Sequence, residues 1–396
     1  ALDHAPRLPD AGGVGITGGM DRPSPPDHAR SDVIGSLLRP PALLAARERH
    51  ARGEATDEEL RLAEDEAVDE ALRLQEDAGL DVVTDGEMRR LSFQSRLVEA
   101  VEGFGEWDVD AFLWGEWKSD ALGPLRIERP PLAVVDRLRR RSFLSADEFS
   151  YAQTRTRRTV KVTLPSPSLF ANFWDPARST SAYATLEDFL GDVAEVLRQE
   201  VDELVRRGAT YIQLDAPHYP LLVDPAYRDF YERRGWPAER WIEMGAELDA
   251  YVVGSHPGVT FGMHLCKGNQ MSRWLVAGGY DWLAGRLFSR VPVQRLLLEY
   301  DDERSGGFEP LREVPEPMVA VLGLLTTKTG RLETVAELET RIAAAALFLP
   351  LDRLALSPQC GFATSIAGNA LTAEEQAAKL RRVAEVARRV WDQPPT

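Results

Sequence analysis

Residues 56–79 show apolar and polar positions that alternate with the period of a helix. Leucine and alanine recur every three or four positions there, between glutamate and aspartate residues. Thr56 and Glu59 have the spacing of a capping box, and Gly79 is the residue type that commonly ends a helix. The next run, 81–84, is short and rich in valine. The pattern therefore predicts a helix that is followed at once by a buried strand.

The same alternation of short apolar runs and amphipathic stretches continues along the chain. It predicts eight strands, at 33–35, 82–84, 160–164, 211–214, 260–264, 296–299, 318–323 and 354–357. It predicts helices from Pro41 into 56–79 and at about 186–207, 238–253, 271–288, 333–348 and 373–391. Such alternation is typical of an α/β fold, a parallel (β/α)8 TIM barrel, with a doubly wound sheet as the alternative. No G-x-G-x-x-G follows a strand and no Walker loop occurs, so nucleotide binding has no support.

Two segments do not follow this rhythm. Residues 1–30 contain several prolines and glycines and little apolar material, which predicts a flexible arm. Residues at about 101–155 are irregular and hold Trp107, Trp114 and Trp117, which predicts a segment inserted into the barrel. We therefore expect an arm over 1–30 and one barrel domain over 31–396.

Composition narrows the function classes. The chain has 396 residues, 44% of them hydrophobic, and a formal net charge of −16. This acidity argues against a nucleic acid or an anionic membrane as partner, and no apolar run is long enough to span a bilayer. The start of the chain shows no apolar core of a signal peptide, and two cysteines exclude a disulfide framework. We expect a cytoplasmic enzyme.

Polar side chains occur where the predicted strands end, which is where barrels place their catalytic groups. Four of them, which are His264, Cys266, Glu299 and Cys360, suit a borderline-soft ion such as zinc. His264 and Cys266 would face the same side, because the side chains of a strand repeat every two residues. The alternative is that the cysteines are small buried hydrophobes and Glu299 begins a solvated acidic turn. As a set on neighbouring strand ends, the residues favour a metal site.

These residues stand in motifs that resemble a known family. The runs 262–266 (G-M-H-L-C), 297–299 (L-L-E) and 357–361 (S-P-Q-C-G) resemble the catalytic domain of cobalamin-independent methionine synthase. The resemblance covers about residues 31–391. It implies a (β/α)8 barrel and zinc held by His264, Cys266, Glu299 and Cys360. It also implies that a thiol is activated as a zinc-bound thiolate, which attacks an alkyl donor, with a methyl donor as first choice.

The resemblance also implies a binding site for an amino-acid thiol, homocysteine or an analogue. The run Ile34-Gly35-Ser36 resembles the turn that holds the amino-acid end of homocysteine, with Ser36 and nearby backbone amides taking the carboxylate. Asp85-Gly86-Glu87 resembles the D-G-E motif, whose glutamate binds the amino group, and Asp215 ends a strand that does similar work. A homodimer is an expectation from barrels of this kind.

Several positions depart from the family pattern. Lys267-Gly268-Asn269 follows the H-x-C run, and the seventh strand leads into Thr326-Thr327-Lys328 without the family's histidine. His218, after Asp215, is our candidate for proton transfer, so both are candidate catalytic residues, although His218 could have a plain hydrogen-bonding role. Trp174 is a candidate for stacking a pterin of a folate donor, or else a core aromatic.

Two other activities stay open from the sequence, as does a non-catalytic thiol- or metal-binding role in which residues 1–30 and the Trp-rich segment 107–117 would serve a partner. The departures resemble short relatives that include the epoxyalkane:coenzyme M transferase, in which the thiol carries a sulfonate and the electrophile is an epoxide. A uroporphyrinogen-decarboxylase-like lyase would instead need an arginine-lined pocket, for which Arg89, Arg90 and Arg96 are candidates. A lyase of this kind would not explain the set of four candidate zinc ligands.

Overall fold

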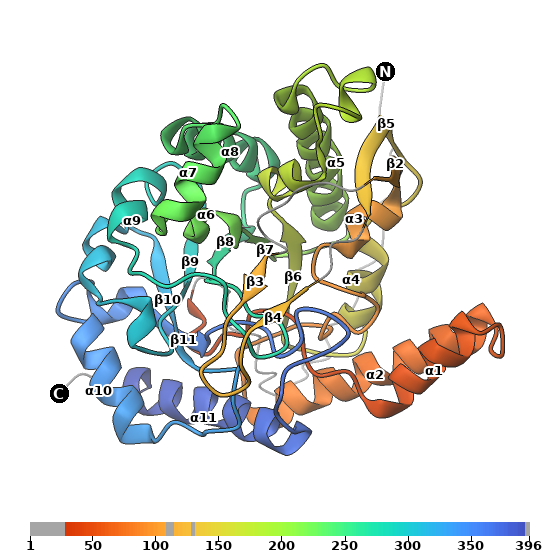
Figure 1. Cartoon of the computed structure of the whole chain (residues 1–396). Helices are drawn as coiled ribbons and strands as arrows, with labels where there is room; N and C mark the ends of the chain where they lie inside the picture. The colour runs from red at the N-terminus through yellow and green to blue at the C-terminus, as the bar shows by residue number, and fades with distance from the viewer. Residues whose placement is uncertain (1–27, 108–114, 128–130, 393–396) are drawn as a thin grey trace, which may run out of the picture.

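The computed structural model describes residues 28–107, 115–127 and 131–392. The predicted arm lies outside the described residues except for its last three positions. Seven parallel strands form one curled sheet in the order β1-β6-β7-β8-β9-β10-β11 (Figure 1). Their bounds are Val82–Val83, Thr159–Pro165, Tyr211–Asp215, Thr260–Leu265, Arg295–Glu299, Val319–Leu325 and Leu354–Pro358. All seven coincide with predicted strands to within a few residues, because each is a fully buried run that is mostly apolar.

The eighth position of the barrel is filled by the segment that precedes Ile34. Ser31 forms a parallel bridge with Leu356 of β11, and the Asp32 amide donates to the Leu356 carbonyl over 2.9 Å. On the other side, the Ser31 hydroxyl accepts from the Asp81 amide, just before β1. The fold is therefore a (β/α)8 barrel. The predicted strand at 33–35 is a single bridge two residues earlier, because the Val33 amide bonds to the Asp32 side chain instead of a neighbouring strand.

A buried ionic cluster fixes this closing segment from inside the barrel. The Asp32 carboxylate lies 2.9 Å from Lys161 Nζ of β6 and 3.5 Å from Arg295 Nε of β9, and it accepts from the Tyr211 hydroxyl over 2.8 Å. All four side chains are buried. Because they come from four different strand positions near the start of each strand, they hold the end of the barrel opposite the functional loops.

Helices cover the outside of the sheet (Figure 1). The long ones are α2 (Asp57–Ala78), α5 (Leu186–Arg206), α8 (Ala238–Val253) and α11 (Ala373–Trp391), whereas α10 (Val335–Ala345) is shorter. The capping box of Thr56 and Glu59 is present at α2, and Gly79 ends it in the left-handed conformation at φ 84°. Shorter helices are α1 (Pro41–Ala51), α3 (Ser95–Ala100), α4 (Ala146–Gln153), α6 (His218–Leu221), α7 (Pro225–Arg233) and the 3-10 helices η3 (Pro167–Phe173) and η5 (Glu303–Ser305). No described helix is long and apolar enough to cross a membrane.

One predicted helix is much shorter in the structure. In place of 271–288, α9 spans Asp281–Leu287. Met271 and Ser272 have positive φ angles of 48° and 63°, and Trp274 bridges Lys118. The first half of the predicted helix is therefore a loop that crosses the mouth of the barrel and meets the inserted segment.

The segment at about 101–155 forms two small antiparallel sheets and α4. Strands β2 (Val101–Glu106) and β5 (Leu132–Arg140) make one, and β3 (Glu116–Trp117) and β4 (Leu125–Arg126) make the other. The turn that joins β3 and β4 accepts a bond from Arg273 at the Gly123 carbonyl. This hairpin therefore lies against the loop that follows β8, beside the carboxyl ends of the barrel strands.

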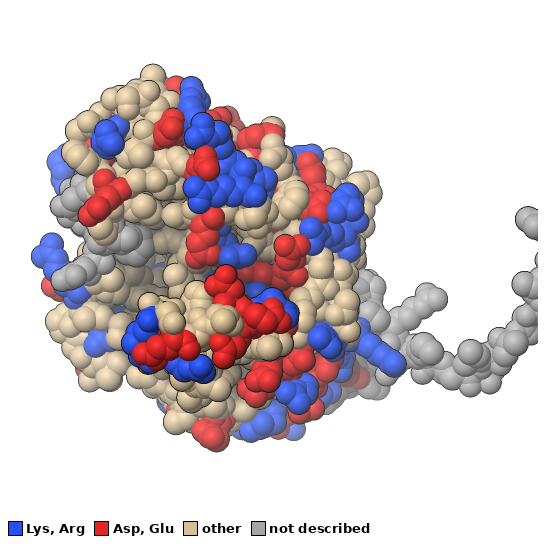
Figure 2. Space-filling view, turned by 90° about the vertical axis from the view of Figure 1, so that its right-hand side faces the viewer, with Lys and Arg blue, Asp and Glu red and all other residues tan. Residues whose placement is uncertain are grey.

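The molecular face in Figure 2 carries basic and acidic side chains side by side. Many are paired along helices, as in the contact of Arg61 with Asp65 at 2.7 Å. This arrangement fits the overall excess of acidic residues.

Candidate metal centre

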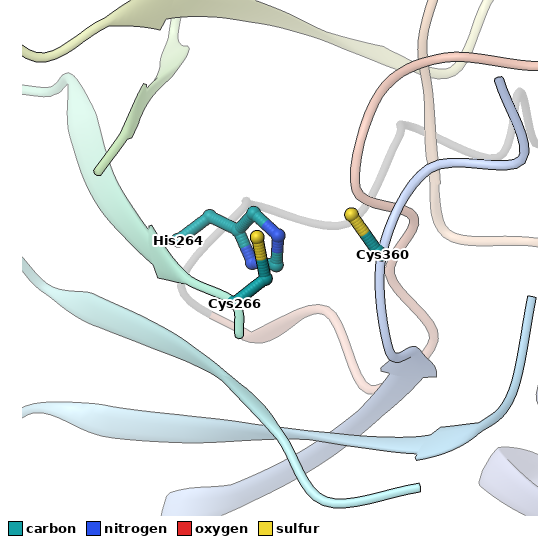
Figure 3. Close-up of side chains that lie close together, drawn as sticks. All are labelled: His264, Cys266 and Cys360. Carbon is teal, nitrogen blue, oxygen red and sulfur yellow. The ribbon is translucent and has the colours of Figure 1, made fainter. Parts of the chain in front are cut away.

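Three side chains that suit a soft metal meet at the carboxyl ends of the barrel strands (Figure 3). His264 lies in β8, Cys266 directly follows β8, and Cys360 follows β11. One ligand atom from each lies within 4.8 Å of the others, and all three residues are buried. His264 and Cys266 share a direction because the strand period is two, whereas Cys360 arrives from a strand three places away in the sheet.

The His264 ring is oriented as a metal-binding imidazole. Its Nδ1 lies 3.3 Å from the Leu297 carbonyl oxygen, which fixes the ring plane and makes Nδ1 the proton donor. Its Nε2 is buried and has no hydrogen-bond partner. A buried unpartnered nitrogen costs free energy unless it has a ligand, and this pairing of one bonded and one open nitrogen is usual at metal sites. The residues present therefore fit a borderline-soft ion.

The two thiols influence each other. A hydrogen bond from Cys360, together with the nearby His264 ring, lowers the pKa of Cys266 well below its usual value. The same hydrogen bond and burial raise the pKa of Cys360. Cys266 is thus the thiol that ionises first, and the thiolate is the form that binds metal.

Glu299 is not part of this three-residue group. It ends β9 and is fully buried, and its Oε2 accepts the Lys267 backbone amide over 2.7 Å. Its Oε1 lies 2.9 Å from Arg304 Nη2 and 3.1 Å from Lys328 Nζ. The carboxylate sits beside the cysteine loop but is already engaged by two cations. The sequence analysis did not predict that Arg304 and Lys328 would pair with Glu299.

The three residues open onto a cavity of about 150 Å³. Its wall includes four of the predicted substrate residues, namely Ile34, Ser36, Glu87 and Asp215. Gly35 lies behind this wall, where it leaves room for Glu87. The structure therefore brings four of the predicted substrate residues and the three candidate metal ligands to one space.

Two carboxylates give this space its charge. Glu87 Oε1 accepts from the Thr163 hydroxyl over 2.7 Å, whereas its Oε2 is buried without a partner. Asp215 Oδ1 accepts from Gln213 Nε2 over 2.7 Å. Burial, reinforced by the charge of Glu87, raises the pKa of Asp215 to about 7. A cationic group near both carboxylates would lower the free-energy cost of keeping Asp215 ionised in this buried site.

The structure does not bring His218 or Trp174 to the cavity. His218 is fully buried in α6, its Nε2 lies 2.7 Å from Ser168 Oγ, and burial lowers its pKa to about 3. It is therefore neutral and enclosed, which does not support proton exchange with a substrate. Trp174 lines a separate cavity of about 180 Å³ together with Trp236 and Trp241.

The three candidate arginines of a lyase pocket are paired with carboxylates, and Arg90 Nη1 lies behind the cavity wall at 3.7 Å from Glu87 Oε1. Arg89 pairs with Asp65, and Arg90 and Arg96 both reach Glu148. None of the three is on the cavity wall. The described residues thus offer a lyase no arginine-lined pocket from these positions.

The cavity wall also includes side chains that the sequence did not single out for function. They are Phe93, Gln94, Trp117, Asn269, Gln270, Thr364 and Ser365. The sequence could have indicated Asn269, because it closely follows the candidate ligand Cys266. No feature of the sequence indicated that Trp117 would reach the cavity, because its place there depends on how the inserted hairpin folds back.

Comparisons with known proteins show the family to which the chain belongs. The model of the family described as "Cobalamin-independent synthase, Catalytic domain" matches residues 30–389. The YxjH protein of Bacillus subtilis is 34% identical over 365 residues, which are 91% of this chain and 94% of that protein. A methionine synthase of Saccharolobus solfataricus is 25% identical over 335 residues, 83% and 86% of the two chains.

A solved structure shows the same fold. The B12-independent methionine synthase from Shewanella sp. W3-18-1, in complex with selenomethionine, has a TM-score of 0.70 at 19% identity. The match covers 92% of this chain and 98% of that one. The chain belongs to the family of cobalamin-independent synthase catalytic domains.

Proposed function

We propose that this member of the cobalamin-independent synthase family is a zinc-dependent methyltransferase whose acceptor is a thiol with an ammonium group. Homocysteine is the acceptor that fits first. The observation that carries the proposal is the meeting of His264, Cys266 and Cys360 on one cavity wall with Glu87 and Asp215.

His264, Cys266 and Cys360 would hold the zinc, with Glu299 as the fourth ligand of the family's set. Zinc bound there supplies Lewis acidity, which lowers the pKa of a thiol that enters its coordination sphere. The two cysteine thiolates offset the metal charge, so that a substrate sulfur keeps its nucleophilicity. The Leu297 carbonyl holds His264 in the orientation that leaves Nε2 open.

Glu87 and Asp215 would bind the ammonium group of the acceptor. Glu87 Oε2 is buried and unpartnered, so an ammonium donor would satisfy an atom that otherwise has none. Ser36 would donate to the carboxylate at the other end. These contacts fix the thiol relative to the three metal-binding residues, which reduces the entropy lost on reaching the transition state.

The charge of the cavity discriminates between acceptor thiols. Among the described residues on its wall, two are carboxylates and none is lysine or arginine, although Arg90 lies behind the wall at 3.7 Å from Glu87 Oε1. A sulfonate-bearing thiol would place its anion beside these carboxylates, and like charges at short range repel. An amino-acid thiol is therefore favoured over a thiol of the coenzyme M type.

The first experiment is the zinc content per chain, followed by metal-edge absorption with and without homocysteine. One zinc that gains a sulfur neighbour on addition of homocysteine supports the proposal. Zinc whose absorption edge does not change on addition of homocysteine contradicts homocysteine as the acceptor, and other thiols are then tested. If protein that was never exposed to chelators holds no zinc, the proposed zinc dependence is wrong.

A further inference from the structure

The two segments in which this chain departs from its family are hydrogen-bonded to each other. Asn269, three residues after Cys266, donates from Nδ2 to Thr327 Oγ1 over 2.9 Å. Thr327 lies two residues after β10, in the stretch where the resemblance led us to expect a histidine. The two departures therefore form one local structure.

Thr327 also holds the residues on both sides of Cys360. Its backbone amide donates to Gln359 Oε1 over 2.7 Å. Its hydroxyl lies 2.7 Å from the same oxygen and 3.0 Å from the Gly361 carbonyl oxygen, the two acceptors for its proton. Asn269 Nδ2 donates to that Gly361 carbonyl as well, over 2.9 Å. The loops that carry Cys266 and Cys360 are thus joined through Thr327 and Asn269.

Asn369 completes the connection. Its Nδ2 donates to Asn269 Oδ1 over 3.1 Å and to the Thr327 carbonyl over 2.8 Å, and its Oδ1 accepts the Ser272 amide over 2.8 Å. Asn269, Thr327, Gln359 and Asn369 are all buried. Gln359 Nε2 is buried without a partner, whereas the polar side-chain atoms of Asn269, Thr327 and Asn369 are all bonded. Such bonds hold these three residues in one arrangement, because breaking one leaves a buried group unpaired.

The sheet alone does not fix the distance between the two cysteines. Cys266 follows β8 and Cys360 follows β11, and the sheet order places β9 and β10 between these strands. The thiols nevertheless come within 4.8 Å of each other across the mouth of the barrel. Side chains from the loops after β8, β10 and β11 must therefore provide the link.

We propose that Asn269, Thr327 and Asn369 are positioning residues that hold Cys266 and Cys360 at the separation required by one metal ion. This inference rests on the proposed function, because it concerns the affinity of the same three-residue centre. The positioning residues Asn269, Thr327 and Asn369 act through the loops and bring no ligand atom of their own. Outer residues that orient metal ligands commonly change metal affinity by about 10- to 100-fold when they are substituted.

The test compares Thr327→Val, which removes the hydroxyl and keeps the shape, with Thr327→Ser, which keeps the hydroxyl. The dissociation constant for zinc is measured in each purified full chain by competition with a chromophoric chelator. We expect Thr327→Val to weaken zinc binding by about 10- to 100-fold and Thr327→Ser to restore most of the affinity. Cobalt substitution adds a second readout, since the sulfur-to-cobalt charge-transfer bands report on both thiolates and should weaken in Thr327→Val alone.

Asn172→Ala is the matched control for loss of a buried amide. Among the described residues, the Asn172 side chain donates to the Leu169 carbonyl alone, within η3, and it lines the separate cavity with Trp174. Its zinc affinity and cobalt spectrum should match those of the wild type. If Thr327→Val does not fold, Asn369→Ser removes two donor bonds of the same network and gives the same comparison.

The outcomes separate this inference from the proposed function. Wild-type zinc binding together with an unchanged affinity and cobalt spectrum in the Thr327→Val or Asn369→Ser variant would overturn the positioning role alone. A wild-type chain without zinc would overturn the metal proposal and the positioning role with it.

Discussion

Gly35 leaves the space that the Glu87 carboxylate occupies: a Cβ atom at Gly35 would lie 2.6 Å from Glu87 Oε1. Real Cβ atoms do not approach an oxygen so closely, so any larger residue would push the carboxylate away. Glu87 itself has a positive φ of 55°, which is uncommon for a residue with a side chain. The turn that carries Gly35 and the turn that carries Glu87 are therefore shaped around each other.

Gly35→Ala should displace Glu87 and weaken the binding of an amino-acid thiol. We expect kcat/KM for homocysteine to fall by up to about a hundredfold, the usual cost of misplacing a substrate contact by about 1 Å, while zinc content stays at the wild-type value. Gly191→Ala is the control, because no atom lies within 4 Å of the added Cβ there. It should leave kcat/KM unchanged and stabilise α5 by about 0.5–1 kcal/mol. Equal kinetics for both variants would contradict the spatial role of Gly35.

Glu87→Gln should affect acceptor thiols according to whether they carry an amine. The variant removes the negative charge that an ammonium group would meet, a contact worth about 2 kcal/mol, or about thirtyfold in affinity. We expect that loss for homocysteine and a much smaller one for 4-mercaptobutanoate, the same thiol without its amine. Steady-state kinetics with both thiols make the comparison. Equal losses would remove the ammonium-binding role.

Cys266→Ser and Cys360→Ser should each lose zinc while the barrel stays folded. A serine hydroxyl does not ionise as a thiol does and is a poorer ligand for zinc. Glu299→Gln should lose less zinc affinity than either serine variant, because the Glu299 carboxylate is shared with Arg304 and Lys328. Metal analysis after dialysis ranks the three variants, and circular dichroism checks the fold. A loss in Glu299→Gln as large as in the cysteine variants would show that the carboxylate leaves these cations for the metal.

Asp249 should make the protein less stable as the pH rises from about 5 to 8. Burial in α8 raises the pKa of its carboxyl to about 7, against hydrogen bonds from Ser166 and Tyr219. Between the ordinary value of 3.8 and about 7, the folded chain binds a proton that the unfolded chain has released, so the free energy of unfolding falls with rising pH. The contribution lost between pH 5 and 8 is about 3 kcal/mol.

Asp249→Asn removes this contribution, so the change in unfolding free energy between pH 5 and 8 should be smaller than in the wild type by about that amount. Denaturant unfolding at the two pH values measures it. Asp229→Asn, at an exposed position of α7, is the control and should keep the wild-type pH dependence. If Asp249→Asn behaves like this control, Asp249 is ionised throughout the range.

Much of the barrel could be predicted from the sequence because its strands are buried on both faces. A continuous apolar run such as 354–356 is typical of the interior of a parallel sheet. The predictions were less accurate where a segment is defined by its partners. Residues 271–280 have a helix-like composition but form a loop, because positive φ angles at Met271 and Ser272 and the bridge between Trp274 and Lys118 hold them across the barrel mouth.

The sequence by itself determined which chemical groups lie at the carboxyl ends of the strands. The two-residue period of β8 was enough to place His264 and Cys266 on one side, and the D-G-E and first-strand motifs supplied residues that line the same cavity. These are local relationships, set by backbone geometry within a few residues.

Only the tertiary structure decided which of these groups meet. Cys360 reaches Cys266 through the network of Thr327 and Asn269, Glu299 is paired with Lys328 and Arg304, and His218 and Trp174 lie in separate surroundings. Each of these outcomes depends on contacts between loops that are distant in the sequence. Such contacts follow from packing and hydrogen bonding in the folded chain, and no spacing of residues along a single segment encodes them.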